Sequence, residues 1–247
     1  MTDTRISGTR RAGRAFVMAL SALALLAGGA IWQLALRAPP VDLLPLPERL
    51  VSLTAPEGRR MLAETLASAD YQPLMKTFES QHRPAFCGVA SSVAVLNALR
   101  PSGPRLTQAS FFADLPTELR VTFTGMTLQQ LGELLRQHGA KVEIVFAAGA
   151  TLDAFRAIAR ENLSRSGDYV LVNYQRTSLG QHGGGHISPL AAYSASTDRF
   201  LILDVAAYRY PPTWVPAVDL WNAMNTVDTT SGQTRGFAVI QGTRRPN

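Results

Sequence analysis

The feature that most constrains this chain is a stretch of 22 residues without a charge, Ala15–Leu36 (AFVMALSALALLAGGAIWQLAL). A helix of this length, at ~1.5 Å per residue, can cross the ~30 Å hydrocarbon layer of a membrane. Four arginines precede the stretch, which favours a cytoplasmic N-terminus and export of everything after Leu36. Two interpretations stay open: a signal anchor, or a signal peptide cleaved after the small residues 28–30. A buried core helix is disfavoured because the stretch is apolar all round.

The domain boundaries that we expect follow from this segment. Residues 1–14 form a basic N-terminal region, residues 15–36 the signal segment, and residues 37–47 a linker stiffened by four prolines. Residues 48–247 show no internal repeat and are expected to form one domain. This domain would lie in the periplasm, either soluble or anchored by the N-terminal helix.

The composition excludes several classes of protein. Of the 247 residues, 46% are apolar and 17% are charged, which supplies a core and excludes wholesale disorder. The net charge is +6, but residues 1–37 carry five arginines against one aspartate, and no basic run with interleaved aromatic residues follows. A nucleic-acid partner is therefore not expected. Cys87 is the one cysteine, which excludes an internal disulfide and a zinc site with several thiolates.

Hydrophobic periodicity predicts mainly helices in the first half of the domain and strands in the second. The predicted helices cover residues 58–69, 88–99, 127–138 and 153–163, and Thr127 is the predicted N-cap of the third. The predicted strands cover residues 142–146, 169–174, 186–193, 200–205 and 236–241. This order predicts an α+β fold, with a helical side packed on an antiparallel sheet and a cleft between the two.

Cys87 stands where a thiol becomes reactive. It precedes a predicted helix of small residues in PAFCGVASSVAVLNAL, and a helix N-terminus lowers the pKa of a thiol. Gln81 lies six residues earlier, the spacing used by papain-like enzymes. Its carboxamide and the Cys87 backbone N–H would form an oxyanion hole with two donors. The alternative is that Cys87 packs in the core and that Gln81 is a surface residue.

His186 is the candidate general base and Asp204 its candidate partner. His186 follows three glycines and begins a predicted strand, so its ring can project from the strand end into the cleft. Asp204 closes the apolar run FLILD, where a buried acid needs a partner such as an imidazole N–H. The alternative is that both residues merely cap strands.

The remaining histidines do not favour a metal centre. A zinc site made of Cys87, His182 and His186 is disfavoured because the glycines between the two histidines leave no regular element to fix the ligand geometry. His138 stands before Gly139 at a predicted helix end, where a cationic side chain suits the helix dipole. We expect no metal site in the protein and no required cofactor.

Several motifs together identify a family. The segments FESQHRPAFCGVASSVAVLNAL, HISPLAAY, LDVAAYRYPPTWV and TRGF resemble the phytochelatin synthases, over about residues 71–240. The resemblance implies a papain-like fold, the triad Cys87, His186 and Asp204, and Gln81 as oxyanion donor. It also implies a glutathione γ-glutamylcysteinyltransferase, in which the thiol attacks the Cys-Gly bond of glutathione and glycine leaves. Water then resolves the acyl-enzyme to γ-Glu-Cys, or a second glutathione resolves it to phytochelatin.

The chain resembles the short bacterial type of the family, because no cysteine follows Cys87. We therefore expect deglycylation of glutathione to dominate over transfer. A link to heavy-metal detoxification is implied by the family, with Cd²⁺ or Zn²⁺ entering as glutathione thiolates. The γ-glutamyl group carries an α-carboxylate and an α-ammonium, so its pocket should contain an arginine and an acid. The candidates are Arg176, Asp228 and Arg235.

Two other functions stay open at this point. One is a papain-like peptidase that acts on peptide chains, for instance at double-glycine sites. The other is a catalytically inactive module that binds thiols or metals at the cell surface. The partners that we consider for the leading function are glutathione, the membrane through residues 15–36 if this segment is uncleaved, and a second copy of the chain.

Overall fold

The computed structural model describes residues 5–242, of which residues 5–17 and Leu34 are described by their backbone alone. A seven-stranded sheet runs through the domain in the order β1-β6-β5-β4-β3-β7-β2, and all neighbouring strands are antiparallel. The strands are β1 Val51–Ser52, β2 Ala140–Phe146, β3 Asp168–Gln175, β4 Gly185–Ser194, β5 Arg199–Ile202, β6 Thr213–Pro216 and β7 Gly236–Gly242. The predicted α+β fold with an antiparallel sheet is confirmed.

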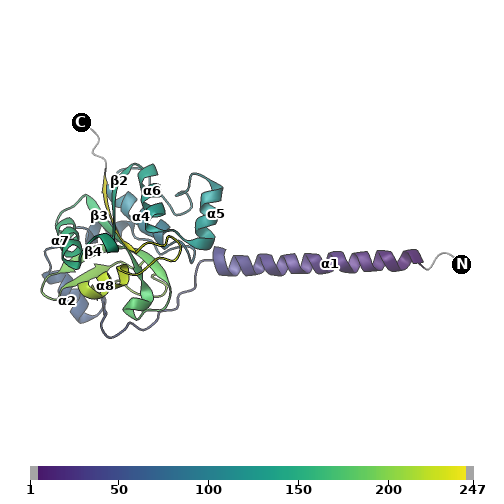
Figure 1. The fold of residues 1–247 in the computed structure, drawn as a ribbon, viewed down its shortest axis with the longest axis horizontal. Helices are drawn as coiled ribbons and strands as arrows, with labels where there is room; N and C mark the ends of the chain where they lie inside the picture. The colour runs from purple at the N-terminus through teal and green to yellow at the C-terminus, as the bar shows by residue number, and fades with distance from the viewer. Residues whose placement is uncertain (1–4, 243–247) are drawn as a thin grey trace.

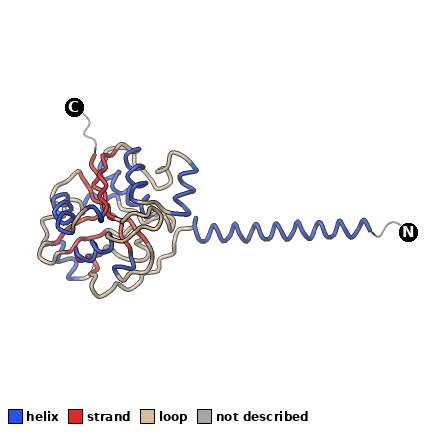
Figure 2. Tube along the Cα trace, in the orientation of Figure 1, coloured by secondary structure: helices blue, strands red, loops and turns tan. Residues whose placement is uncertain are grey.

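Helices cover both faces of this sheet, as Figure 2 shows around the central strands. The α-helices are α1 Arg5–Ile31, α2 Pro56–Glu64, α3 Tyr71–Thr77, α4 Cys87–Leu99, α5 Leu115–Thr124, α6 Leu128–Gln137, α7 Leu152–Leu163 and α8 Ala217–Met224. Short turns of other helix types are η1 Trp32–Leu36, η2 Ala147–Gly149 and η3 Arg176–Leu179. The core below α3, α4 and α6 is separate from the core below α7 and α8. The sequence analysis expected one helical side packed on the sheet, and the structure adds a second helical layer on the other face.

Strand β3 explains why both faces are covered. Its alternate residues Tyr169 and Leu171 enter one core, and Val170, Val172 and Tyr174 enter the other. All of these side chains are almost fully buried. A strand that is apolar on both faces needs a helix layer on each side.

Helix α4 lies in the middle of one helical layer. It is buried along nearly its whole length, so its small and apolar residues show no amphipathic stripe. Ser91 in its second turn donates a 3.0 Å hydrogen bond to the backbone oxygen of Ile187 in β4. This bond fixes the first turn of α4 against the start of β4.

The N-terminal helix α1 extends away from the domain in Figure 1. Its large apolar side chains from residue 18 onward are exposed. In the part of the chain that the structure describes, no helix was found that is both long and apolar enough to cross a membrane. The membrane segment predicted over residues 15–36 is thus not confirmed, and the side chains of its first three residues lie outside those described.

The predicted linker, residues 37–47, contains no regular element in the structure. It nevertheless lies against the domain. The backbone N–H of Asp42 donates to Tyr208 at 2.8 Å, and that of Leu44 donates to Arg209 at 3.0 Å. Both acceptors are backbone oxygens in the segment that follows Asp204.

Candidate active site

Cys87, His186 and Asp204 come from three separate parts of the fold and meet at one point. Cys87 is the first residue of α4, His186 is the second residue of β4, and Asp204 follows the end of β5. The Cys87 thiol is hydrogen-bonded to the His186 ring. The Nε2 atom of His186 lies 2.9 Å from Oδ1 of Asp204, which leaves Nδ1 for the thiol. The structure therefore brings together the three residues predicted as a triad.

The electrostatics of Cys87 and His186, which form a hydrogen-bonded pair, favour an ionised thiol. Burial would raise the pKa of Cys87, but the hydrogen bond and charge of His186, a hydrogen bond from the Ile187 backbone and the charge of Arg176 lower it overall. Burial and Arg176 would lower the pKa of His186, but Asp204 and the bond to Cys87 raise it overall. A thiolate beside an imidazolium is the nucleophile that such shifts produce.

Asp204 is held as a carboxylate by three donors on one oxygen. Its Oδ1 accepts from His186 at 2.9 Å, from Nη2 of Arg176 at 2.7 Å and from the backbone N–H of Ala206 at 2.9 Å. Burial alone would raise the pKa of Asp204, but the positive charges of His186 and Arg176 bring it well below its usual range. Asp204 can therefore stabilise the imidazolium without taking its proton.

Arg176 does not lie where the sequence analysis expected it. Its guanidinium is 3% exposed and donates to Gln181 at 2.9 Å and to Asp204 at 2.7 Å. The aromatic ring of Tyr210 lies 5.2 Å from it. A guanidinium engaged in this way is not free for a substrate carboxylate, so its placement favours positioning of Asp204 over the predicted substrate contact.

Tyr174 closes the other side of the histidine. It is paired with His186 across β3 and β4, and the two rings meet edge to face with centroids 5.7 Å apart. Burial raises the pKa of Tyr174 far above its usual range, so its hydroxyl stays neutral. The ring thus packs against the imidazole and limits its rotation.

Gln81 lies beside the loop that leads to Cys87, but its amide group is already engaged. Its Nε2 donates to the backbone oxygens of Arg83 at 3.0 Å and Pro84 at 2.7 Å. Its Oε1 is buried without a partner. Both amide hydrogens thus point at the loop. Gln81 can donate to an oxyanion only if one of these two hydrogen bonds to the loop is broken.

A cavity of about 370 Å³ opens over the thiol and the imidazole. Two of the predicted substrate-binding residues, Asp228 and Arg235, line it. Nη1 of Arg235 lies 3.3 Å from Oδ2 of Asp228, and its Nη2 donates to Gln175 at 3.1 Å. Its Nε is buried and has no partner. The cavity therefore presents an acid and an arginine with unused hydrogen-bonding capacity within reach of Cys87.

Gly185 makes room for this arginine. A Cβ at residue 185 would lie 2.9 Å from Nη2 of Arg235. The glycine next to His186 thus lets the guanidinium approach the start of β4 closely. On the opposite wall, a Cβ at Gly88 would lie 2.6 Å from the sulfur of Met126, so Met126 packs directly on the first turn of α4.

No metal centre accompanies this site in the described part of the chain, where no group of three or more His, Cys, Asp and Glu side chains is arranged to hold a metal ion. His182 contacts Tyr210 through its backbone N–H. The ring of His138 is hydrogen-bonded to the backbone oxygen of Phe111 at 2.8 Å and stacks on the Phe111 ring. His138 therefore packs as a structural residue.

Comparison with known proteins places the chain in a family. The family model described as phytochelatin synthase matches residues 41–237. The chain belongs to the phytochelatin synthase family. It is similar to glutathione γ-glutamylcysteinyltransferase 3 of Lotus japonicus, with 34% identity over 206 residues, and to glutathione γ-glutamylcysteinyltransferase 1 of Triticum aestivum, with 38% identity over 200 residues. The corresponding enzyme of Schizosaccharomyces pombe is 27% identical over 206 residues.

These matches cover 77–79% of the chain but only 40–50% of the relatives. The chain therefore spans half the length of these phytochelatin synthase relatives or less. Among solved structures, it is similar to xylellain, a cysteine protease from Xylella fastidiosa, with a TM-score of 0.38 and 13% identity. That similarity covers 81% of this chain and 88% of xylellain.

The sequence analysis of this family member missed a buried polar side chain of the cavity. Asn173 in β3 is 3% exposed and lies in the cavity wall, across β3 and β4 from Ile187. It interrupts the apolar run YVLVNY, and a polar residue inside such a run is the signal that would have indicated it. Phe123 at the end of α5 also lines the cavity, but α5 was not predicted.

Proposed function

We propose that this protein is a glutathione γ-glutamylcysteinyltransferase that forms its acyl-enzyme on Cys87. The supporting observation is the row of hydrogen bonds from Cys87 through His186 to Asp204 below a cavity that contains an acid and an arginine. The relatives carry this activity in their names, and the match covers half of their length or less. A nucleophile at a helix N-terminus that faces a histidine on a sheet is also the arrangement of a papain-like fold.

Acylation follows from the charges of the pair. The Cys87 thiolate attacks the carbonyl carbon of the Cys-Gly bond, and the carbonyl oxygen becomes an oxyanion. The imidazolium of His186 then gives its proton to the nitrogen of the departing glycine as the C–N bond breaks. The products are free glycine and a γ-Glu-Cys thioester on Cys87, with His186 neutral.

Deacylation uses the neutral imidazole as a base. His186 takes a proton from a water molecule or from the amine of a second glutathione as it attacks the thioester. The sulfur leaves as the thiolate and the pair is restored. Water yields γ-Glu-Cys, and glutathione yields phytochelatin, so a role in heavy-metal detoxification would depend on the second route.

The oxyanion needs donors in the first turn of α4. The first N–H groups of a helix have no partner within the helix, and the backbone N–H of Cys87 is the first of them. Gln81 can supply the second donor when one of its amide hydrogens leaves the oxygen of Arg83 or Pro84. Arg235 and Asp228 are then suited to the carboxylate and the ammonium of the γ-glutamyl group.

Deglycylation should be the main reaction. Aiming a second glutathione at the thioester requires an ordered acceptor site, whose contribution can reach about 7–11 kcal/mol when ideal, whereas water is always abundant. The cavity of about 370 Å³ next to Cys87 has to hold the γ-Glu-Cys group. Metal ions would then enter as glutathione thiolates, since deacylation itself needs no metal.

The experiment is a product analysis by mass spectrometry of the full chain incubated with glutathione. We expect glycine and γ-Glu-Cys at low millimolar glutathione, with phytochelatin increasing as glutathione rises. Predominant phytochelatin at low millimolar glutathione would contradict the preference for hydrolysis. An absence of both products, with cleavage of unrelated peptides instead, would refute the proposed function in favour of a peptidase.

We also propose that residues 15–36 target the domain for export, as an anchor or as a cleaved signal. The uncharged sequence supports this, as do the exposed apolar side chains of α1 from residue 18 onward. Fractionation of expressing cells, with N-terminal sequencing of the recovered protein, distinguishes the two forms. Recovery of the intact chain in the cytoplasmic fraction alone would contradict export.

A further inference from the structure

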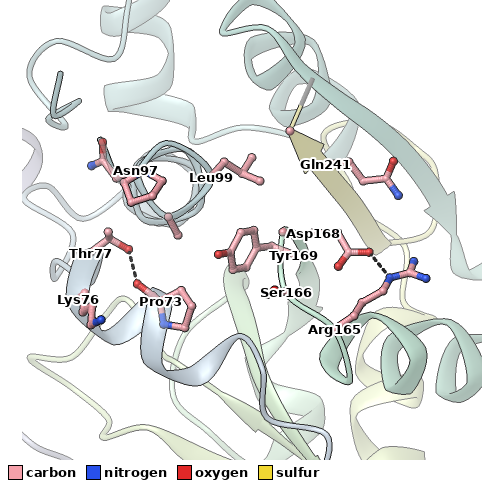
Figure 3. Close-up of a pocket in the computed structure, with 14 residues that line it drawn as sticks. Pro73, Lys76, Thr77, Asn97, Leu99, Arg165, Ser166, Asp168, Tyr169 and Gln241 are labelled. Carbon is pink, nitrogen blue, oxygen red and sulfur yellow. Dashed lines mark hydrogen bonds and ion pairs between the residues drawn. The ribbon is translucent and has the colours of Figure 1, made fainter. Parts of the chain in front are cut away.

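A second and larger cavity, of about 930 Å³, lies at the opposite end of α4 from Cys87. Its wall includes Asn97 and Leu99 in the last turn of this helix, and Asp168 and Tyr169 at the start of β3 (Figure 3). The 13 residues of α4 separate the two sites by about 18 Å, at ~1.5 Å per residue. The cavity is therefore distinct from the site that holds the triad.

The hydroxyl of Tyr169 points into this cavity in Figure 3. The residue is 2% exposed, and within the described part of the chain its hydroxyl has no hydrogen-bond partner. The ring of Tyr169 is buried, whereas its hydroxyl oxygen is accessible from the cavity. This hydroxyl is thus poised to accept or donate a hydrogen bond from a molecule in the cavity.

Two acids, Asp168 and Asp70, lie next to this hydroxyl. Asp168 is 4% exposed, and its Oδ2 accepts from Arg165 at 2.9 Å while its Oδ1 is buried without a partner. Asp70, at the N-cap of α3, is fully buried, and neither of its carboxyl oxygens has a partner among the residues that the structure describes. Burial, and then the charge of Asp168, raise the pKa of Asp70 to about 9. At neutral pH Asp70 is therefore protonated, and Asp168 is the charged acid of the two.

The end of α4, like the carboxylate of Asp168, favours a positively charged group in this cavity. The last carbonyl groups of a helix carry a partial negative charge, and those of α4 end at the cavity wall. Two cationic side chains also line the cavity, namely Lys76 and Arg165. Lys76 is exposed, and the side chain of Arg165 is 53% exposed. Arg165 can therefore turn toward solvent and share Asp168 with an incoming cation.

We propose that this cavity binds a primary ammonium compound of the size of a short peptide. Its ammonium group lies between the Tyr169 hydroxyl, the carboxylate of Asp168 and the last turn of α4. The rest of the molecule contacts the apolar surface of Pro73 and Leu99, and the nearby polar side chains offer partners for its peptide groups. These polar side chains are Thr77, Asn97 and Gln241.

Calorimetric titration of the full chain with a matched pair of probes tests this. Triglycine amide carries the ammonium group, and N-acetyl-triglycine amide is its neutral counterpart. We expect binding of the first and none of the second. Because a hydrogen bond to a charged group contributes about 1.5–3 kcal/mol, Tyr169→Phe should weaken binding roughly tenfold or more. Equal binding of both probes, or no binding of either, would refute the proposal.

Further variants separate the site from its alternatives. Asp168→Asn should abolish binding, and its partner Arg165 is exposed enough to be solvated when left alone. Unchanged affinity in both Tyr169→Phe and Asp168→Asn would overturn the proposed contacts. Calcium chloride is the third probe: if it binds and triglycine amide does not, the cluster is a metal site. Glycine release from glutathione should be unchanged in Tyr169→Phe, since this residue lies outside the catalytic site.

Discussion

Arg176 donates a 2.7 Å hydrogen bond to the same oxygen of Asp204 that binds His186. Arg176 and Asp204 are both almost fully buried, at 3% and 2% exposure. A buried carboxylate that lost this arginine would remain with an unbalanced charge. The stability of the domain and the ionisation of the triad are therefore coupled through one side chain.

Replacement of Arg176 should be costly for folding. We expect Arg176→Gln to lower the free energy of unfolding by about 3–5 kcal/mol, as is typical when one partner of a buried ion pair is removed. Denaturant unfolding followed by circular dichroism measures the change. Arg60→Gln is the matched control, because Arg60 and its partner Glu64 are both exposed, and this variant should lose less than about 1 kcal/mol. Equal stability of the two variants would contradict the positioning role of Arg176.

Replacement of Asp204 should lower the rate strongly, in addition to the stability that is lost when the buried Arg176 loses its partner. In Asp204→Asn the amide no longer stabilises an imidazolium, so we expect kcat to fall by roughly two orders of magnitude or more. Glycine release measured from pH 6 to 9 checks this. Near-normal rates across that range in a folded variant would show that another group orients His186.

The pH dependence of thiol reactivity follows from the two shifted pKa values. Because the pKa of Cys87 is lowered, its thiolate persists at pH values below the usual thiol pKa of ~8.5. Because the pKa of His186 is raised, its ring stays charged at pH values above the usual histidine pKa of ~6.5. Alkylation of Cys87 by iodoacetamide should thus stay fast at neutral pH and decline only as the thiolate is protonated. In His186→Gln the decline should begin at higher pH. Identical profiles for both proteins would argue against the ion pair.

Substrate binding should depend on Arg235 more than on other arginines. Its Nε is buried without a partner beside the cavity, so we expect Arg235→Gln to raise KM for glutathione roughly tenfold or more, with a smaller change in kcat. Arg60→Gln again serves as the control and should leave KM unchanged. A large loss of kcat at constant KM would instead place Arg235 in the chemical step.

Asp70 should make the domain less stable as the pH rises. Its pKa is about 9 in the folded protein against 3.8 for an ordinary aspartate, and Asp168, Tyr169 and Arg165 are the titratable groups of its cluster. Below pH ~4 the group is protonated in both states, and between pH 4 and 9 only the folded state keeps the proton, so unfolding becomes easier as pH rises. Asp70→Asn should remove this slope and raise Tm by at least about 3 °C at pH 8. An equal decrease of Tm with pH in the wild-type protein and in Asp70→Asn would contradict this prediction.

The sequence indicated much of the site because its signals were local. Cys87 before a helix of small residues, and Asp204 at the end of an apolar run, each follow from a few neighbouring residues. The Thr127 cap and the β3, β4 and β7 strands were also placed within one or two residues of their observed ends. Strong local signals of this kind survive in the tertiary structure.

Other features depended on contacts that no local pattern carries. The bond of Arg176 to Asp204 joins residues 28 positions apart, and an arginine at the end of a strand looks the same in the sequence whether it faces a substrate or an acid. Gln81 was placed beside Cys87, but the direction of its amide depends on the loop that follows it. Helix α5 was missed because it is short and rich in threonine, with a proline in its first turn.

The measurement that tests the central claim most directly is intact-protein mass spectrometry of the chain, quenched in acid after brief mixing with glutathione. The wild-type protein should gain the mass of one γ-glutamylcysteinyl group, located on Cys87 by peptide mapping, while free glycine appears in equal amount. Cys87→Ser, which is nearly isosteric, should remain folded and should show neither the adduct nor glycine release. Glycine release by folded Cys87→Ser above a few per cent of the wild-type rate, or an adduct at another residue, would contradict the assignment of Cys87 as the nucleophile.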